Sequence, residues 1–390
     1  MDKSDLKKLL IISGVFLVFY FLPADLGRIS AGLNEAVLMM NDYARKHVLL
    51  CLIPAFFIAG AISVFVKSDS VIKYLGVGAS IVVAYAVAGV SGFIIAVCSC
   101  TILPIFAGIY FRGAGIGPAT VFLYSGPAIN ILAITMTARV LGFELGFART
   151  ILAISFSIII GLCMAFIFRK EDKERLEDIE ADESSEAGIS LWRIIVLVGS
   201  LIGFLIFANF GDAGTDAGLL YTLRSIKWPL AIFFAATSVL SALFLFNKTQ
   251  IKEWLLSTLD FTLKVTPLLF IGVLTAGFLL GRPGHEALIP SHWIESLLGG
   301  NSFTTNLFAA VTGGMMYFAT LTEVPIIQGL VGAGMGNGPA LTLLLAGPAV
   351  SLPAILVLAG ILKWKKTLTY IGLVIIFSAI AGFVFGLIYP

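Results

Sequence analysis

The sequence predicts an all-α polytopic membrane protein with about 10–13 membrane segments, built as an inverted-topology repeat whose helices are broken at Gly-Pro pairs. Three observations predict this fold: an apolar composition, recurring apolar runs of membrane-spanning length, and an internal repeat. Of the 390 residues, 59% are hydrophobic and only 12% are charged, whereas a soluble globular chain carries about 25% charged residues. Bulk water is therefore not the main solvent of this chain.

Apolar runs of roughly 17–25 residues recur from end to end, which is the length that a helix needs to cross about 30 Å of hydrocarbon. A shorter run, 9–22, follows Lys7 and Lys8. It is expected to be a retained first membrane helix, because no small-x-small cleavage site of a signal peptide follows it. The best-defined runs are 48–66, 79–97, 146–168, 191–210, 228–246, 262–281, 339–362 and 367–389.

A charged stretch, 169–190, divides the chain nearly in half and is too polar to span a membrane. It separates an N-terminal membrane half, 1–168 with a repeat core at 48–168, from a C-terminal membrane half, 191–390 with a repeat core at 262–390. Lysines precede the first membrane run, and lysine and arginine begin the charged stretch. The positive-inside rule therefore predicts a multi-pass protein of the cell (inner or cytoplasmic) membrane, with its N-terminus and this linker in the cytoplasm.

An internal repeat appears when the chain is shifted against itself, so that Ala88–Ile134 lies over Ala309–Ile355 without a gap, with about 18 identical positions. A weaker match sets Pro54 on Pro267. The aligned pairs include Pro104 with Pro325, Gly113 with Gly334, and Gly126-Pro127 with Gly347-Pro348. If the N-terminus is cytoplasmic and every segment crosses, the two matched halves run in opposite directions, which is the architecture of many secondary transporters.

The short segments 98–113 and 321–333 are expected either to span the membrane or to re-enter it as half-helices. Each lies before a Gly-Pro step that interrupts an apolar stretch. Because proline removes a backbone donor, the helix should break there, and a break is tolerated in a membrane only inside protein or along a cavity. The substrate-binding candidates at the two breaks are Ser125, Gly126, Pro127, Asn130, Gly347, Pro348 and Ser351. A plain structural kink, with Asn130 and Ser351 repairing the backbone, is the alternative.

Two cysteines precede the first of these breaks. Cys98, Ser99 and Cys100 are candidate substrate contacts together with Pro104, because thiols suit soft ligands such as trivalent arsenic or other soft metal species. On a regular helix Cys98 and Cys100 point apart, so joint ligation needs irregular backbone here. The alternative is that both are small apolar fillers. No cofactor is expected, and no metal site beyond soft ligation by these two thiols.

Glu323, next to Thr322, is one of very few carboxylates in the apolar segments. A membrane-embedded acid is by default a proton or ion site, so Glu323 and Thr322 are candidates for ion or proton coupling. The alternative is a helix start, with Thr322 as the cap and Glu323 in the first turn. Arg149, like Arg112 and Arg139, is expected to extend its charge to a membrane interface.

The stretch 98–130 resembles the signature of the permease family that includes the organoarsenical efflux permeases. The matching residues are Cys98, Cys100, Pro104, Gly108, Gly113, Gly117, Pro127 and Asn130. The match is strongest here and in the repeat copy, about a quarter of the chain, and Thr101 stands where the family pattern has a small residue. The resemblance implies a permease, with export of trivalent organoarsenicals as the activity of some members.

Together these features predict a secondary-active permease and not an enzyme, which exports a small solute with a soft, thiol-seeking atom by alternating access. The alternatives are a transporter of a small inorganic sulfur anion with a cysteine relay, a membrane thiol oxidoreductase and a channel. The expected partners are membrane lipid, the small-molecule substrate, a coupling proton and a second copy of the chain in a homo-oligomer. No nucleic acid is expected, because the net charge is only +2 and no basic cluster lies on a soluble domain.

Overall fold

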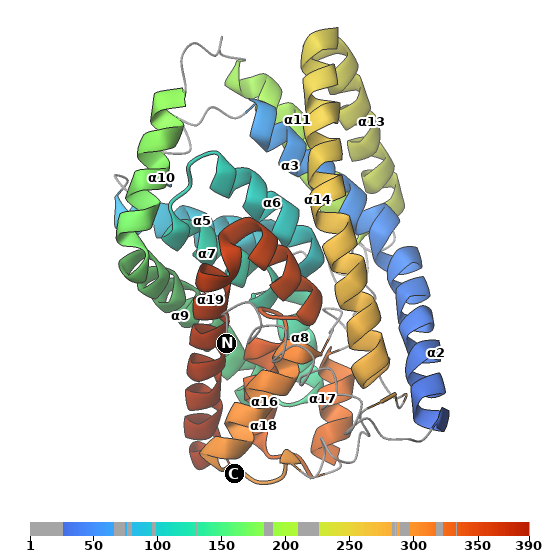
Figure 1. The fold of residues 1–390 in the computed structure, drawn as a ribbon, viewed down its shortest axis with the longest axis vertical. Helices are drawn as coiled ribbons and strands as arrows, with labels where there is room; N and C mark the ends of the chain where they lie inside the picture. The colour runs from blue at the N-terminus through green and yellow to red at the C-terminus, as the bar shows by residue number, and fades with distance from the viewer. Residues whose placement is uncertain are drawn as a thin grey trace, which may run out of the picture.

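The computed structural model describes residues 26–65, 75, 80–95, 99–129, 131–182, 190–209, 226–282, 285, 287–288, 297–316, 323–332 and 334–389. Every regular element in these residues is a helix, so the all-α prediction is confirmed (Figure 1). The elements are α2 Leu26–Tyr43, the π-helix η1 Ala44–Leu52, α3 Ile53–Phe65, α5 Ile81–Ile95, α6 Ser99–Phe111, α7 Ile116–Ala128, α8 Ile131–Val140, α9 Phe143–Ile167, α10 Arg169–Asp182, α11 Leu191–Ala208, α13 Lys227–Leu245, α14 Lys248–Leu280, α16 Phe303–Met315, α17 Glu323–Gly332, α18 Asn337–Ala346 and α19 Leu352–Ile388.

Five stretches of helix within the described residues are long and apolar enough to cross a membrane. They are Val48–Phe65, Phe143–Ile167, Lys227–Leu245, Lys248–Leu279 and Leu352–Ile388. Apolar side chains cover much of the outer surface: Val82 is 77%, Phe244 is 81% and Phe166 is 83% exposed. A surface of this kind is stable against lipid and not against water, so the chain is a polytopic membrane protein.

The helix bounds recur at the same offset as the sequence repeat. The bounds of α8 and α9 recur 221 residues later in the two parts of α19, and α7 and α18 begin at equivalent residues. In Figure 1 the first group, α5 to α7, lies in the upper half of the view, and the second group, α16 to α18, lies in the lower half. The sequence repeat is therefore also a repeat of helical elements.

Equivalent residues take the same unusual backbone conformation in both copies. Gly113 has φ 95° and Gly334 has φ 105°, each in the turn before α7 or α18. Gly142 has φ 107° before α9, and its counterpart Lys363, inside α19, has φ 67°. A left-handed residue ends a helix, so α19 is two helices that meet at Lys363. The inverted orientation of the two copies in the membrane stays a prediction.

A close crossing of two helices is also repeated. A Cβ added to Gly117 of α7 would lie 3.0 Å from the carbonyl oxygen of Gly161 on α9. In the second copy, a Cβ on Gly338 of α18 would lie 2.6 Å from the carbonyl oxygen of Gly382 on α19. Small residues allow backbones to approach this closely, which is how membrane helices commonly associate.

Gly382→Ala is expected to destabilise the protein by about 1–3 kcal/mol, because the new Cβ would lie 1.9 Å from Thr342 Oγ1 and 2.5 Å from the Gly338 carbonyl oxygen. Gly372→Ala on the same helix is the matched control, since nothing lies within 4 Å of its added Cβ. Thermal unfolding in detergent should show a lower midpoint for Gly382→Ala alone. Equal midpoints for the two variants would contradict the close crossing.

Helix α14 packs antiparallel along the bent helix formed by α2, η1 and α3. Near one end, the added Cβ of Gly277 would meet the backbone of Ala36, and near the other end Trp254 Nε1 donates to the carbonyl oxygen of Phe57 over 2.8 Å. The sequence pattern of residues 251–259 favours an interfacial helix lying on the membrane. That interpretation is wrong, because α14 continues without a break from Lys248 through Pro267 to Leu280.

Candidate functional site

Both predicted interruptions occur in the structure, close to the Gly-Pro steps. In the first copy α7 continues through Pro127 to Ala128, and the break lies between Ala128 and the start of α8 at Ile131. The break is therefore later than predicted, because a proline removes only its own backbone donor and leaves the last turn of the helix in place. In the second copy α18 ends at Ala346, and α19 begins at Leu352. Gly347 and Pro348 lie in the turn between them.

The two interruptions are adjacent in space. Tyr124 of α7 donates its hydroxyl hydrogen bond to the carbonyl oxygen of Leu345 of α18 over 3.3 Å, and these two residues occupy equivalent positions in the repeat. Tyr370 of α19 donates to the carbonyl oxygen of Ala349 over 3.2 Å. All of residues 113–129 and 338–351 are buried. The two broken helices therefore meet inside the protein and do not face lipid.

The candidate residues of the first break have different surroundings. Ser125 is fully buried and donates to the carbonyl oxygen of Phe122 within its own helix over 3.3 Å. A Cβ added to Gly126 would lie 2.8 Å from the side chain of Ile102, so this glycine allows α6 and α7 to pack closely. Pro127 is buried in the last turn of α7. Asn130 lies outside the described residues.

Ser351 has an unsatisfied hydroxyl. It precedes the first residue of α19 in an extended conformation, with φ −133° and ψ 155°, and makes no side-chain cap hydrogen bond. The residue is 2% exposed, and its Oγ has no hydrogen-bond partner in the described part of the chain. A hydroxyl beside the positive end of a helix, within the protein, is available to a ligand.

The largest fully buried side chain in the described part of the chain is a charged one. Arg149 of α9 is 0% exposed and forms an ion pair with Glu323 of α17, which is 1% exposed. The Nη2 atom of Arg149 donates to Oε1 of Glu323, and Nη1 donates to Thr137 Oγ1 of α8 over 2.8 Å. Thr137 itself donates to the carbonyl oxygen of Ala133 over 2.7 Å. This ion pair joins the two repeat copies.

The ion pair is not fully satisfied. Nε of Arg149 and Oε2 of Glu323 are both buried without a partner among the described residues. Each such atom costs about 1–3 kcal/mol. A buried ion pair stabilises a fold little in comparison with apolar residues of the same size, so its presence favours a functional role.

The structure corrects the sequence-based interpretation of Arg149. We expected its charge to reach a membrane interface, but the side chain is completely buried. The repeat itself carried a signal, because Arg149 is equivalent to buried Tyr370 and Glu323 is equivalent to buried Ile102. Each copy thus carries one charged residue of the pair, at a position where the other copy has an uncharged residue.

The cysteine motif is only partly described. Cys98 lies outside the described residues, as does Thr322, while Ser99 and Cys100 form the first turn of α6 and Pro104 lies within that helix. Sequence reasoning missed Cys51 of η1, whose Sγ lies 2.5 Å from Oγ1 of Thr101. A third thiol therefore contacts the residue that follows Cys100 in the chain. No cluster of three or more His, Cys, Asp or Glu side chains is found in the described part.

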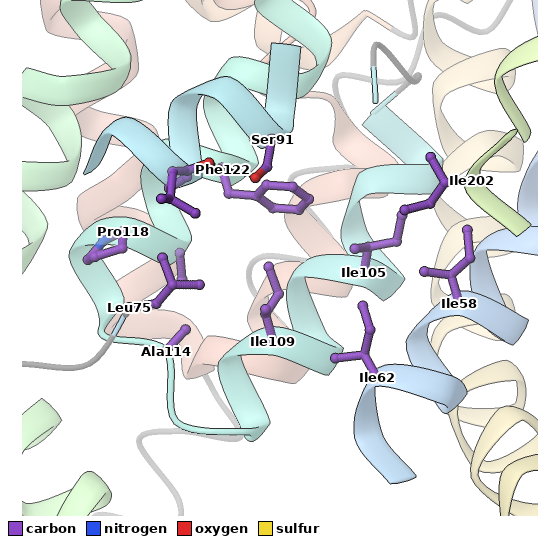
Figure 2. A pocket seen from close by; sticks show the side chains of 13 residues that line it. Ile58, Ile62, Leu75, Ser91, Ile105, Ile109, Ala114, Pro118, Phe122 and Ile202 are labelled. Atoms are coloured by element: carbon purple, nitrogen blue, oxygen red, sulfur yellow. Dashed lines mark hydrogen bonds between the residues drawn. The ribbon is translucent and has the colours of Figure 1, made fainter. Parts of the chain in front are cut away.

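An apolar cavity of about 140 Å³ lies among helices of the first half and α11 (Figure 2). Its walls come from α3, α5, α6, α7 and α11, with Ile58, Ile105 and Phe122 among them. The hydroxyl of Ser91 donates to the carbonyl oxygen of Val87 within α5, so it offers little to a ligand. An engineered apolar cavity of about 150 Å³ holds benzene, so this space suits a small apolar group and not a polar solute.

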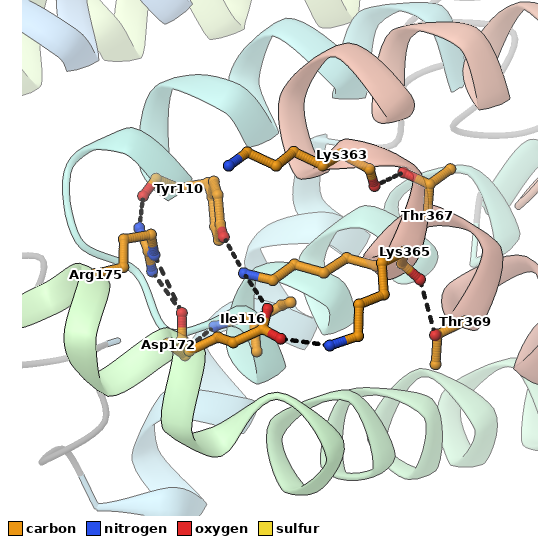
Figure 3. A network of polar contacts seen from close by, with 10 residues as sticks. Tyr110, Ile116, Asp172, Arg175, Lys363, Lys365, Thr367 and Thr369 are labelled. Atoms are coloured by element: carbon orange, nitrogen blue, oxygen red, sulfur yellow. Dashed lines mark hydrogen bonds and ion pairs between the residues drawn. The ribbon is translucent and has the colours of Figure 1, made fainter. Parts of the chain in front are cut away.

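The charged linker begins with helix α10, which holds the turn between α6 and α7 (Figure 3). Asp172 Oδ2 accepts a hydrogen bond from the backbone N–H of Ile116 over 2.7 Å, at the start of α7. Arg175 donates to the carbonyl oxygens of Tyr110 and Ala114 over 2.5 and 2.6 Å, and stacks on the Tyr110 ring at 3.9 Å. Thus α10 satisfies backbone groups at the end of α6 and the start of α7.

The same helix contacts the second copy. Lys365 of α19 donates to Glu171 over 2.6 Å, and Lys366 donates to the Tyr110 hydroxyl over 3.3 Å (Figure 3). The hydrogen bond from Lys365 lowers the pKa of Glu171, so this carboxylate stays ionised at neutral pH. These contacts join the two copies beside Lys363, at the point where α19 changes direction.

Asp172→Ala is expected to destabilise the turn between α6 and α7 by about 1.5–3 kcal/mol, because it removes the acceptor for the Ile116 N–H and the partner of Arg175. Hydrogen exchange at residues 113–116 should become at least about tenfold faster. Glu174→Ala, on the exposed face of α10, is the control and should leave exchange unchanged. Equal exchange in both variants would show that α10 does not hold the turn.

Comparison with known proteins agrees with this architecture. A family model described as "Predicted permease" matches residues 33–387. The UPF0718 protein MJ0584 of Methanocaldococcus jannaschii is 42% identical over 357 residues, which cover 91% of this chain and 96% of that protein. The UPF0718 protein YraQ of Escherichia coli is 45% identical over 58 residues, 15% of this chain and 17% of that protein. No solved structure matches the chain.

The match covers both repeat copies, the two interruptions and the buried ion pair, and it bears out the resemblance that was seen in residues 98–130. A membrane protein of this kind contacts lipid and moves a small molecule. This chain belongs to the predicted permease family.

Proposed function

We propose that this permease is a secondary-active exporter, in the cell membrane, of a small solute with a soft, thiol-seeking atom, such as a trivalent organoarsenical. The two halves would be inverted relative to each other and would alternate in exposing a central site to the two sides of the membrane. The observation that carries the proposal is the buried Arg149–Glu323 ion pair, which joins the two copies beside both broken helices.

The arrangement of the helices supports inversion. Helix α14 runs antiparallel to α2 and α3, as expected if the helices that carry Pro54 and Pro267 cross the membrane in opposite directions. The two groups α5–α7 and α16–α18 lie in opposite halves of the view (Figure 1). A hydrogen bond between the equivalent residues Tyr124 and Leu345 is expected near a pseudo-two-fold axis.

The substrate would bind where the two breaks meet. Ser351 offers an unpaired hydroxyl there, and Gly347 and Pro348 lie in the turn between α18 and α19. Ser125, Gly126, Pro127 and Asn130 would form the other wall, with Ser99, Cys100 and Pro104 on the neighbouring helix α6 and Cys98 directly before that helix in the chain. The thiols of Cys98 and Cys100 would contact the soft atom.

Glu323 is the proposed coupling residue, with Thr322 beside it. While Glu323 is ionised, it holds Arg149 and so keeps the two copies together. Protonation of Glu323 would weaken this attraction, so proton binding would favour separation of α17 from α8 and α9. Proton movement is thereby linked to movement of one copy against the other.

On the side assigned to the cytoplasm, the structure holds the two copies together. The contacts of Lys365 with Glu171 and of Lys366 with Tyr110 would have to break before a solute could enter from that side. Export therefore requires an inward-open state in which α10 and the Lys363 bend of α19 move apart.

Transport by purified protein in sealed liposomes tests the proposal. Phenylarsenite uptake into inverted vesicles should saturate with concentration and should increase when an imposed proton gradient is applied. If thiosulfate blocks the transport site and phenylarsenite itself is not taken up, the result would instead favour the sulfur-anion transporter. The helix end at Ser351 is the feature that supports this alternative. Flux of phenylarsenite without saturation would indicate a channel.

A further inference from the structure

The ion pair between Arg149 and Glu323 is only half of the double contact that these groups form elsewhere. An arginine and a carboxylate commonly pair through two parallel N–H···O bonds. Here Nη2 donates to Oε1 and Nη1 is occupied by Thr137, while Nε and Oε2 have no partner among the described residues. Nε is bonded to the same guanidinium carbon as Nη2, and Oε2 is bonded to the same carboxyl carbon as Oε1. The unpaired donor and the unpaired acceptor therefore belong to the same polar centre.

A free N–H donor together with a free carboxylate oxygen calls for a group that both accepts and donates a hydrogen bond. A hydroxyl does both, since its oxygen accepts from Nε and its proton is donated to Oε2. An anion without a proton offers nothing to Oε2 and is repelled by the Glu323 charge. We propose that this pair is a recognition site for a hydroxyl on an uncharged solute, with Arg149 and Glu323 as the residues that select for it.

The position of the pair agrees with a role in the transport path. Both side chains are shielded from the outside, at 0% and 1% exposure, so a solute reaches them only from within the protein. Tyr124, which contacts α18 at Leu345, lies on α7, and α7 packs against α9, the helix that carries Arg149. The equivalent residues Tyr370 and Ile102 are uncharged, so the repeat supplies one such site in each chain and not two.

This inference rests on the proposed function and narrows it. Of the two substrate classes above, the site favours the uncharged hydroxylated one, such as the dihydroxy form of a trivalent organoarsenical, over a small sulfur anion. It also separates two parts of recognition. One cysteine thiol bonds the soft atom while one hydroxyl leaves with the thiol proton as water, and the ion pair contacts the second hydroxyl, which the soft atom keeps.

Two matched probes test this separation. Phenylarsenite carries hydroxyls on a soft atom, and phenylboronic acid carries two hydroxyls on a hard atom and is uncharged at neutral pH. Binding is measured on the full-length protein in nanodiscs by equilibrium dialysis. Wild-type protein should bind both probes and should bind thiosulfate at least tenfold more weakly. The double variant Arg149→Leu with Glu323→Leu should lose at least tenfold in affinity for phenylboronic acid, while Cys163→Ser, outside the proposed site, should leave that affinity unchanged.

Glu323→Gln supplies a second arm that preserves the shape of the site. It leaves the Arg149 charge uncompensated, so affinity for thiosulfate should rise at least tenfold relative to wild type. Glu144→Gln, an exposed carboxylate on the same helix as Arg149, is the control and should change nothing. Melting temperatures without ligand confirm folding of each variant.

The proposal is overturned if wild-type protein prefers thiosulfate to phenylboronic acid, or if the double variant binds phenylboronic acid as tightly as wild type does. Failure of the proposed function has a different signature. In that case Cys98→Ser and Cys100→Ser would leave phenylarsenite binding unchanged, while binding of phenylboronic acid would still depend on Arg149 and Glu323.

Discussion

Replacement of Glu323 alone by leucine is expected to destabilise the folded protein by about 3–5 kcal/mol. The substitution leaves the Arg149 guanidinium buried, charged and without its carboxylate. The double variant Arg149→Leu with Glu323→Leu removes both charges and should recover most of this loss, because leucines of similar size need no hydrogen-bond partner. Reversible chemical unfolding in detergent micelles measures both values.

The comparison of single and double variants identifies the cause. Glu144→Leu, at an exposed position in the first turn of α9, is the control and should change stability by less than about 0.5 kcal/mol. If Glu323→Leu were as mild as the control, the two charges would not be paired in the membrane. If the double variant were as unstable as the single one, the loss would come from packing and not from an uncompensated charge.

The second large effect is on transport. Cys98→Ser and Cys100→Ser are each expected to reduce phenylarsenite transport at least tenfold, which corresponds to about 1.4 kcal/mol of lost interaction. A serine hydroxyl has nearly the shape of a thiol but is a hard ligand, so the change removes affinity for the soft atom and little else. Initial rates in proteoliposomes at equal protein content provide the measurement.

Cys163→Ser is the matched control, since this half-buried cysteine on α9 lies outside the motif and forms no disulfide. Its transport should equal that of wild type. Cys51→Ser is informative as well, because Cys51 contacts Thr101 next to the motif. Normal transport by both Cys98→Ser and Cys100→Ser would reduce the motif to apolar packing and would remove the reason for a thiol-seeking substrate.

Much of the fold could be predicted from the sequence because lipid imposes simple rules. Apolar runs of spanning length fixed the positions of α9, α11 and α13 to within a few residues. The repeat of paired glycines and prolines located both interruptions, since these residues change the backbone itself. The bend at Lys363 could not be predicted, because a lysine with positive φ depends on its surroundings and the equivalent residue in the first copy is a glycine.

The site was harder to predict than the fold. Glu323 stood out because acids are rare in apolar segments, but its partner did not, since arginines near helix ends normally extend their charge to the membrane surface. Arg149 lies 174 residues before Glu323 in the chain, and only tertiary packing brings them together. Likewise, nothing local in the charged linker indicated that Asp172 and Arg175 would hold the turn between α6 and α7.

Alternating access to the junction of the broken helices is tested most directly by a cysteine placed at Ser351, in a chain whose native cysteines are serine. Sealed vesicles of each orientation are treated with a membrane-impermeant thiol reagent. We predict that the cysteine reacts from both sides, and that Glu171→Ala, which removes the partner of Lys365 and Lys366, raises the rate from the side on which α10 lies and lowers the rate from the opposite side. Reaction from one side only, or rates that rise together on both sides, would contradict alternating access.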